Sequence, residues 1–374
     1  MQAPDGWRLG RRPALDGLRA IAVVAVMLRH SMLLDWLPEH SFLRVTGGSL
    51  GVVVFLVISG FLITSLLVEE WDRTGAIDFR AFWIRRALRL MPPLAIYLVA
   101  LGLYGAFIRK DSGVTTPIIV ATLFYVANIA EGANKLSSES LQVGGAVWSL
   151  SLEEQFYLLW PSFLRNVLAG RHPLRWVLGI VGFGFAARVF LELKGLHGWT
   201  YFLLPPRLDE LGAGAALAIA MHRGWTPSVR WRAAVGPLLV AVVAVMYLQR
   251  PGHLTELLLV ASPIVALLSC GLVIAAVQAP GFGTGILSSR PLVLVGRWSY
   301  TIYLFHQLAF TMVIHYLPHL WPPLQFLLGA TIAYAVAALM RRFVELPAQR
   351  LKHRFDRVPS AGLSAERVPD PALA

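Results

Sequence analysis

Two ionisable residues, Arg19 and His30, bound a strongly apolar run near the start of the chain, "RAIAVVAVMLRH". They are eleven positions apart, so on an α-helix they share one face and lie about 16 Å apart along the axis. A histidine can take up a proton near neutral pH, and ionisable residues inside a membrane span are functional candidates by default. A snorkelling arginine and an interfacial histidine would explain the pair equally well.

Two adjacent carboxylates, Glu153 and Glu154, stand in the run "WSLSLEEQFYLLWP". If its aromatic residues form an interfacial belt, Glu153 lies roughly 8 Å below the outer boundary, near the depth of His30, roughly 6 Å from the outer end. A buried carboxylate needs a partner. We therefore predict that Glu153 faces His30; the alternative is that both glutamates point into an outer aqueous vestibule.

Arginines cluster in "FWIRRALRLMPP", where Arg86 and Arg89 are three positions apart and share a helix face. A guanidinium fork suits phosphate oxygens. Together with Arg19, these arginines predict a phosphate clamp at the inner side of a membrane. Simple anchoring by the positive-inside rule explains the same residues.

A polar stripe is predicted for "GRWSYTIYLFHQ", where Tyr300, Tyr303 and His306 recur at every third position. An unpartnered histidine facing lipid is costly, so we expect the stripe to line a polar tunnel, with His306 near the midplane. The run "GSLGVVVFLVISGFLITSLL" contains Ser59 and Gly60, small residues that permit close helix approach. Ser59 is also a candidate for facing the tunnel.

Charged residues also open the predicted span that starts in "PPRLDELGAG". Arg207 and Glu210 are three positions apart and could pair, which would leave Asp209 for other contacts. We place Arg207 and Asp209 among the candidate tunnel-lining residues. The alternative is a charged start of a helix with no further role.

The composition indicates the kind of protein in which these residues lie. Of the 374 residues, 56% are hydrophobic and 14% are charged, whereas a soluble domain carries about 25% charged residues. We therefore predict an all-α polytopic membrane protein in a lipid bilayer. The net charge of +12 does not indicate nucleic acid, because the basic residues fall beside predicted inner loops. The single cysteine, Cys270, argues against a disulfide framework or a thiolate metal cluster, and we predict no metal.

Ten segments are approximately long enough to span a membrane: 14–34, 49–68, 88–108, 147–168, 175–193, 202–222, 233–248, 257–278, 293–317 and 324–345. The apolar segment 113–130 is short and contains Pro117 and Asn128. If it crossed, the arginine-rich loops after it would face outward, against the positive-inside rule. We therefore predict a re-entrant or surface segment there, both termini in the cytoplasm, one membrane domain over 1–345 and a disordered cytoplasmic tail over 346–374.

Six motifs in order resemble the acyltransferase 3 family of membrane-bound O-acyltransferases. They are "PALDGLRAIAVVAVMLRH", with the family's Arg-x10-His pair, then "SGFLIT", "RRALRLMP", "WSLSLEEQFYLLWP", "RLDELGAG" and "SYTIYLFH". The resemblance covers about residues 12–345. The chain departs from it in the second predicted span, where Val53 and Leu56 stand at places that are often acidic and phenylalanine.

The resemblance implies an enzyme of the bacterial cytoplasmic membrane that moves an acyl group, usually acetyl, from acyl-CoA to a hydroxyl. Acyl-CoA would be a co-substrate, with no bound cofactor. The Arg-x10-His pair maps onto Arg19 and His30, the arginine pair onto Arg86 and Arg89, and the acidic motif onto Glu153. We expect a stand-alone acyltransferase domain, without the extracytoplasmic domain that many relatives carry. The acceptor would be an envelope polysaccharide, a lipo-oligosaccharide or a macrolide-type metabolite.

These assignments give a hypothetical mechanism. His30 acts as general base on the acceptor hydroxyl or is itself transiently acylated, Glu153 orients its ring, and Arg19, Arg86 and Arg89 bind the donor. Buried ionisable residues would also suit a proton-coupled transporter or exporter of a small molecule. Transporters often show paired halves with broken helices, and we detect no such symmetry in the sequence.

Overall fold

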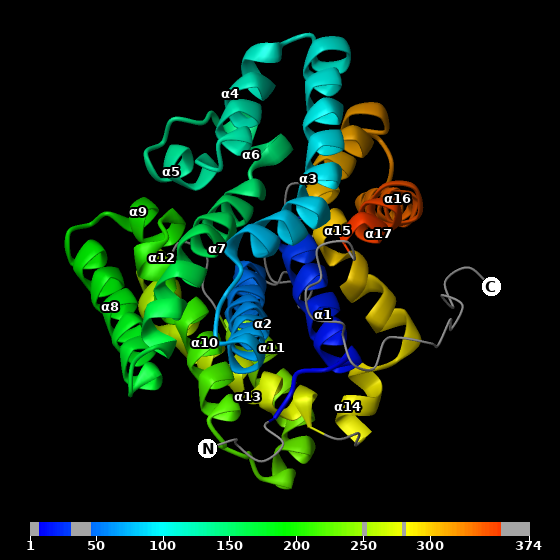
Figure 1. The fold of residues 1–374 in the computed structure, drawn as a ribbon. Helices are drawn as coiled ribbons and strands as arrows, with labels where there is room; N and C mark the ends of the chain where they lie inside the picture. The colour runs from blue at the N-terminus through cyan, green and yellow to red at the C-terminus, as the bar shows by residue number, and fades with distance from the viewer. Residues whose placement is uncertain (1–6, 31–45, 249–252, 279–281, 353–374) are drawn as a thin grey trace.

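The computed structural model describes residues 7–30, 46–248, 253–278 and 282–352, and all regular secondary structure in these ranges is helical. Ten helices within them have 14 residues or more, and each overlaps one predicted span. They are α1 (Pro13–His30), α2 (Leu50–Thr74), α3 (Phe79–Leu103), α7 (Val147–Leu168), α8 (Pro173–Leu193), α10 (Leu208–His222), α11 (Val235–Leu248), α13 (Ser262–Val277), α15 (Arg290–Tyr316) and α16 (Pro322–Met340). Figure 1 shows them gathered into one bundle.

Five helical stretches in the described ranges are long and apolar enough to cross a membrane: Leu50–Thr74, Phe79–Arg109, Pro173–Leu193, Leu254–Val277 and Pro322–Arg350. The predicted all-α fold is thus confirmed for the described residues, with five candidate membrane spans, whereas the count of ten spans stays a prediction. Helices α1, α7 and α15 fall outside this set although each has at least 18 residues. They carry the ionisable residues singled out above, which lower their hydropathy.

The segment predicted to be re-entrant or superficial begins with α4 (Ser112–Leu123), which has 12 residues. Such a helix is about 18 Å long, well short of the roughly 30 Å hydrocarbon core. It is followed by α5 (Ala127–Gly132) and α6 (Ser138–Gly144). The three lie together at one end of the bundle, at the top of Figure 1.

Glycines set the closest helix contacts. A Cβ atom on Gly60 of α2 would collide with the backbone carbonyl of Leu211 in α10, and one on Gly296 of α15 with the carbonyl of Asp16 in α1. The close approach predicted at Ser59 and Gly60 is confirmed. Because α1 packs between α2 and α15, these contacts fix the helices that carry His30, Ser59 and the tyrosine stripe.

The structure differs from the prediction at the C-terminal tail and does not describe the end of the first predicted span. The expected tail begins as a helix, α17 (Leu346–Lys352), which packs against α3, and residues 353–374 lie outside the described residues. The last part of the predicted first span, 31–34, also lies outside them. Short helices complete the described chain: α9 (His197–Phe202), α12 (Leu254–Glu256) and α14 (Phe282–Leu287).

Candidate active site

A cavity of about 300 Å³ lies between α1, α2, α3, α7 and α15. Gly296 of α15 lies against Asp16 of α1, and His306 of α15 against His30 of α1, so these two helices run in the same direction. The cavity follows them from the level of Arg12, just before α1, to the level of Tyr303. It therefore stops just short of the two histidines.

All three predicted phosphate-binding arginines, Arg19, Arg86 and Arg89, line this cavity. Arg86 is held by the protein: its Nε atom is 3.3 Å from Glu154, and its guanidinium stacks 3.1 Å from the centre of the Tyr157 ring. Within the described residues, neither Arg19 nor Arg89 has a hydrogen bond or an ion pair. Two guanidinium groups thus line the same cavity without a direct ion pair to the described part of the chain.

Glu153 also lines the cavity, but it does not have the partner that we predicted. Its Oε2 atom accepts a hydrogen bond of 2.8 Å from the hydroxyl of Tyr157, one turn further along α7. In the described residues no hydrogen bond or ion pair joins Glu153 or Glu154 to His30. The predicted Glu153–His30 contact is therefore corrected, because matching depth in the membrane does not set the direction in which a helix face points.

His30 instead pairs with His306. The Nδ1 atom of His30 lies 2.8 Å from Nε2 of His306, and the ring centres are 5.0 Å apart. On its other side, Nδ1 of His306 lies 2.7 Å from the backbone carbonyl of Tyr303. His306 is fully buried. Because the two rings are in contact, they lie at the same depth in the bundle. The predicted difference in depth, with His306 near the midplane and His30 near the outer end, is therefore wrong.

The tyrosine stripe is mostly where we predicted it. Tyr300 and Tyr303 line the cavity, as does Ser59 from α2. The hydroxyl of Tyr300 donates to the carbonyl of Leu90 at 3.0 Å, and the hydroxyl of Tyr303 lies 2.6 Å from that of Ser149, a lining residue that the sequence did not single out. His306 lies behind Tyr303, outside the cavity wall.

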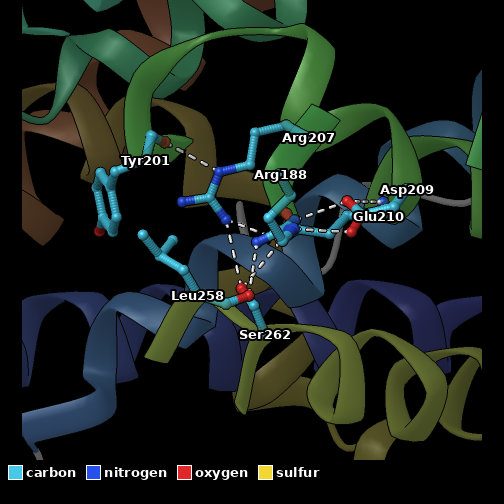
Figure 2. A network of polar contacts seen from close by, with 7 residues as sticks. All are labelled: Arg188, Tyr201, Arg207, Asp209, Glu210, Leu258 and Ser262. Atoms are coloured by element: carbon cyan, nitrogen blue, oxygen red, sulfur yellow. Dashed lines mark hydrogen bonds and ion pairs between the residues drawn. The ribbon is translucent and has the colours of Figure 1, made fainter. Parts of the chain in front are cut away.

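Arg207 and Asp209 belong to a separate, buried network, drawn in Figure 2. Arg207 pairs with Glu210 at 2.8 Å, which confirms the predicted contact. Asp209 is not left free, because Arg188 of α8 donates a hydrogen bond to each of its carboxylate oxygens, at 2.7 and 2.9 Å. Arg188 also reaches Glu210 and the carbonyl of Leu258. Neither Arg207 nor Asp209 lines the cavity, so the predicted tunnel-lining role is wrong. Instead, Asp209 binds Arg188 of α8 and Arg207 contacts Ser262 of α13, so both residues connect neighbouring helices.

One buried carboxylate, Glu131 at the end of α5, was missed entirely. It is 6% exposed, and its Oε1 atom has no hydrogen-bond partner in the described part of the chain. It lies outside the candidate spanning helices, and burial raises its pKa to about 9. The sequence around it has no motif or periodicity that marks it.

The comparisons with known proteins agree on one family. The family model described as an acyltransferase domain, of the acyltransferase 3 family, matches residues 12–342. The chain is 30% identical over 356 residues to a provisionally named O-acetyltransferase of Staphylococcus aureus (strain COL), covering 90% of this chain and 57% of that protein. No solved structure gives a significant match.

Two further relatives carry more specific names. The peptidoglycan O-acetyltransferase OatA of Listeria monocytogenes is 29% identical over 375 residues, covering 90% of this chain and 56% of the relative. The O-acetyltransferase OatA of Staphylococcus aureus (strain NCTC 8325 / PS 47) is 28% identical over 360 residues, with 90% and 57% covered. The chain thus spans little more than half the length of these curated relatives.

Proposed function

Since this chain belongs to the acyltransferase 3 family, we propose that it is a membrane-embedded O-acyltransferase that moves an acyl group, above all acetyl, from acyl-CoA to a hydroxyl. One observation carries this proposal. A single cavity has the unpaired guanidinium groups of Arg19 and Arg89 in its wall and extends to Tyr303, whose carbonyl is bonded to the histidine pair. The cavity thus connects a region suited to binding an anion, at Arg19 and Arg89, with the neighbourhood of His30 and His306, which could transfer protons.

The donor would enter from the side where α1 and α3 begin, which we propose to be the cytoplasmic side, with both termini there. Guanidinium groups bind phosphate oxygens through charge-assisted, often bidentate, hydrogen bonds. Arg19 and Arg89 are close enough to repel each other, and a bound pyrophosphate would relieve that repulsion. Arg86, already paired with Glu154, would add positive potential. The apolar arm of the donor would then follow the cavity toward Tyr303.

His30 would act as general base. In the direct mechanism, it takes the proton of the acceptor hydroxyl while the oxygen attacks the thioester carbon. The tetrahedral intermediate then expels the thiolate of coenzyme A, and the imidazolium of His30 returns the proton to it. In the alternative mechanism, a ring nitrogen of His30 attacks the thioester and expels the thiolate of coenzyme A, which leaves a cationic acyl-imidazole. The acceptor hydroxyl then attacks the acyl carbon, the bond to the ring breaks to return neutral His30, and the hydroxyl proton goes to the thiolate. Glu153, on the cavity wall, would stabilise the positive charge that His30 acquires.

The acceptor that we propose is a sugar-containing compound. One relative is named a peptidoglycan O-acetyltransferase, which favours an envelope glycan of a bacterial cytoplasmic membrane. Lipo-oligosaccharides and macrolide-type metabolites present the same hydroxyl chemistry. A knockout strain whose glycans and secreted metabolites are compared with wild type by mass spectrometry would identify the compound that loses acyl groups.

The activity itself is tested with purified protein in lipid nanodiscs, acetyl-CoA and a panel of glycan acceptors, by measuring the release of coenzyme A. We expect acceptor-dependent release that His30→Ala abolishes while expression and thermal stability are kept. Full transfer by a folded His30→Ala protein would contradict the assignment of His30. Proton-driven uptake of a small molecule into proteoliposomes, without release of coenzyme A, would support the transporter alternative instead.

A further inference from the structure

The hydrogen bonds around His30 and His306 define where the protons on these two rings must lie. A backbone carbonyl oxygen only accepts hydrogen bonds. Nδ1 of His306, which lies 2.7 Å from the carbonyl oxygen of Tyr303, must therefore carry a hydrogen and donate it. A neutral imidazole has one hydrogen on its two nitrogens, so Nε2 of a neutral His306 holds a lone pair.

That lone pair determines the state of His30. Nδ1 of His30 lies 2.8 Å from Nε2 of His306, and a hydrogen bond between them needs a hydrogen from His30. Nδ1 of His30 must then be the protonated nitrogen, and Nε2 of a neutral His30 must hold the lone pair. In histidines generally, the hydrogen bond made by one ring nitrogen decides the protonation of the other.

Both rings are expected to be neutral at rest. His306 is fully buried and His30 is partly buried, and in the described residues no carboxylate is bonded to either histidine. A buried cation without a counter-charge is strongly disfavoured. The packing also holds His306 in place, because its ring contacts the rings of Tyr303 and Phe310, with centres 5.7 and 6.0 Å apart.

We infer that His306 is a positioning residue that fixes the tautomer of His30, so that Nε2 of His30 is the nitrogen that accepts the substrate proton. The role of His30 as base rests on the proposed function, whereas the tautomer does not. When Nε2 takes a proton, His30 becomes a cation that still donates from Nδ1 to His306, and no proton leaves the pair. His306 stays neutral and donates to Tyr303 throughout.

The tautomer is measured directly, without any assay of activity. The full chain would be labelled with ¹⁵N at one histidine ring nitrogen or the other, placed in nanodiscs, and studied by ¹⁵N NMR, with His30→Gln used to identify the His30 signals. We expect a protonated Nδ1 and an unprotonated Nε2 in wild type, and a mixture of tautomers in His306→Phe. A protonated Nε2 on His30 in wild type would overturn the inference.

Kinetics provide the second readout. His306→Phe keeps an aromatic ring but has no acceptor for His30, whereas the side-chain oxygen of His306→Gln can accept from Nδ1. We expect His306→Phe to lower kcat for acetyl transfer by about 100-fold, the scale of a general-base contribution, with KM for acetyl-CoA nearly unchanged. His306→Gln should regain about tenfold over His306→Phe. His315→Phe, an exposed position on the same helix, is the matched control and should match wild type.

The outcomes separate the inference from the proposed function. Equal kcat values for the Gln and Phe variants, with unchanged His30 signals in both, would mean that His306 does not set the tautomer. Absence of acetyl transfer by the wild-type protein would instead contradict the proposed function, and the NMR comparison would still decide the tautomer.

Discussion

Glu153 accepts a hydrogen bond from the hydroxyl of Tyr157, one turn away on α7, while its neighbour Glu154 pairs with Arg86. The two adjacent carboxylates have different partners because successive side chains on an α-helix point about 100° apart. Only Glu153 lines the cavity. In the proposed mechanism, its negative charge would act across the cavity to lower the cost of the positive charge that develops on His30 during transfer.

Neutralising Glu153 should therefore slow the chemical step. We expect Glu153→Gln to lower kcat for acetyl transfer by about tenfold or more, because the transition state loses an electrostatic contribution. The matched control is Glu154→Gln, which should stay within about threefold of wild type in kcat. A larger loss of kcat in Glu154→Gln than in Glu153→Gln would reverse our assignment of the two carboxylates.

Removing one unpaired guanidinium should weaken donor binding. We expect Arg89→Gln to raise KM for acetyl-CoA by about tenfold, the scale of one charge-assisted hydrogen bond to a phosphate, with a smaller change in kcat. The KM of the variant should also depend less on salt than that of wild type. Arg80→Gln, an exposed arginine of α3 outside the cavity, is the control, and an equal effect there would point to membrane topology instead.

The contact between α2 and α10 should tolerate no added methyl group. Because a Cβ on Gly60 would collide with the backbone of Leu211, Gly60→Ala should cost about 1–3 kcal/mol of stability and lower the melting temperature in detergent. Gly179→Ala in α8 is the control, because nothing lies within 4 Å of its added Cβ. It should keep or slightly raise the melting temperature, since alanine favours helix by about 1 kcal/mol. Equal melting temperatures for the two variants would contradict the close packing.

Burial of Glu131 predicts a specific pH dependence of stability. Its pKa is raised from 4.5 to about 9 in the folded protein, so between these values the folded state holds a proton that the unfolded state has lost. The free energy of unfolding should then fall as pH rises from about 4.5 to about 9, by at most about 1.4 kcal/mol per pH unit, and level off above.

The melting temperature of Glu131→Gln should accordingly fall less than that of wild type across this range. The exposed Glu139 provides the control, since Glu139→Gln should follow the wild-type profile. Parallel profiles for wild type and Glu131→Gln would show that the carboxyl group is ionised in the folded protein.

The sequence predicts contacts within one helix better than contacts between helices. Arg207 and Glu210 pair as their spacing of three residues implies. The positions of all ten long helices follow from runs of apolar residues, because burial and lipid contact both select for them. Arg19, Arg86, Arg89, Ser59, Tyr300 and Tyr303 all line the cavity.

The rotation of each helix about its axis is what the sequence does not determine. His30 and His306 are 276 positions apart, and their contact depends on how α1 and α15 turn toward each other. The estimated depths favour Glu153 as the partner of His30, because they place His306 near the midplane. The close approach of Gly296 to the backbone of Asp16 brings α1 and α15 together, and this contact becomes visible only when the two helices are placed together.

The network in Figure 2 has a consequence for how the chain is assembled during its synthesis. Arg188 is fully buried in the folded protein, but on α8 alone it would face lipid, at a cost of about 2.5–3.5 kcal/mol. Its counter-charge, Asp209, is synthesised 21 residues later. Helix α8 should therefore stay at the insertion machinery until α10 emerges, so that the two leave for the bilayer as one hairpin with its charges already matched.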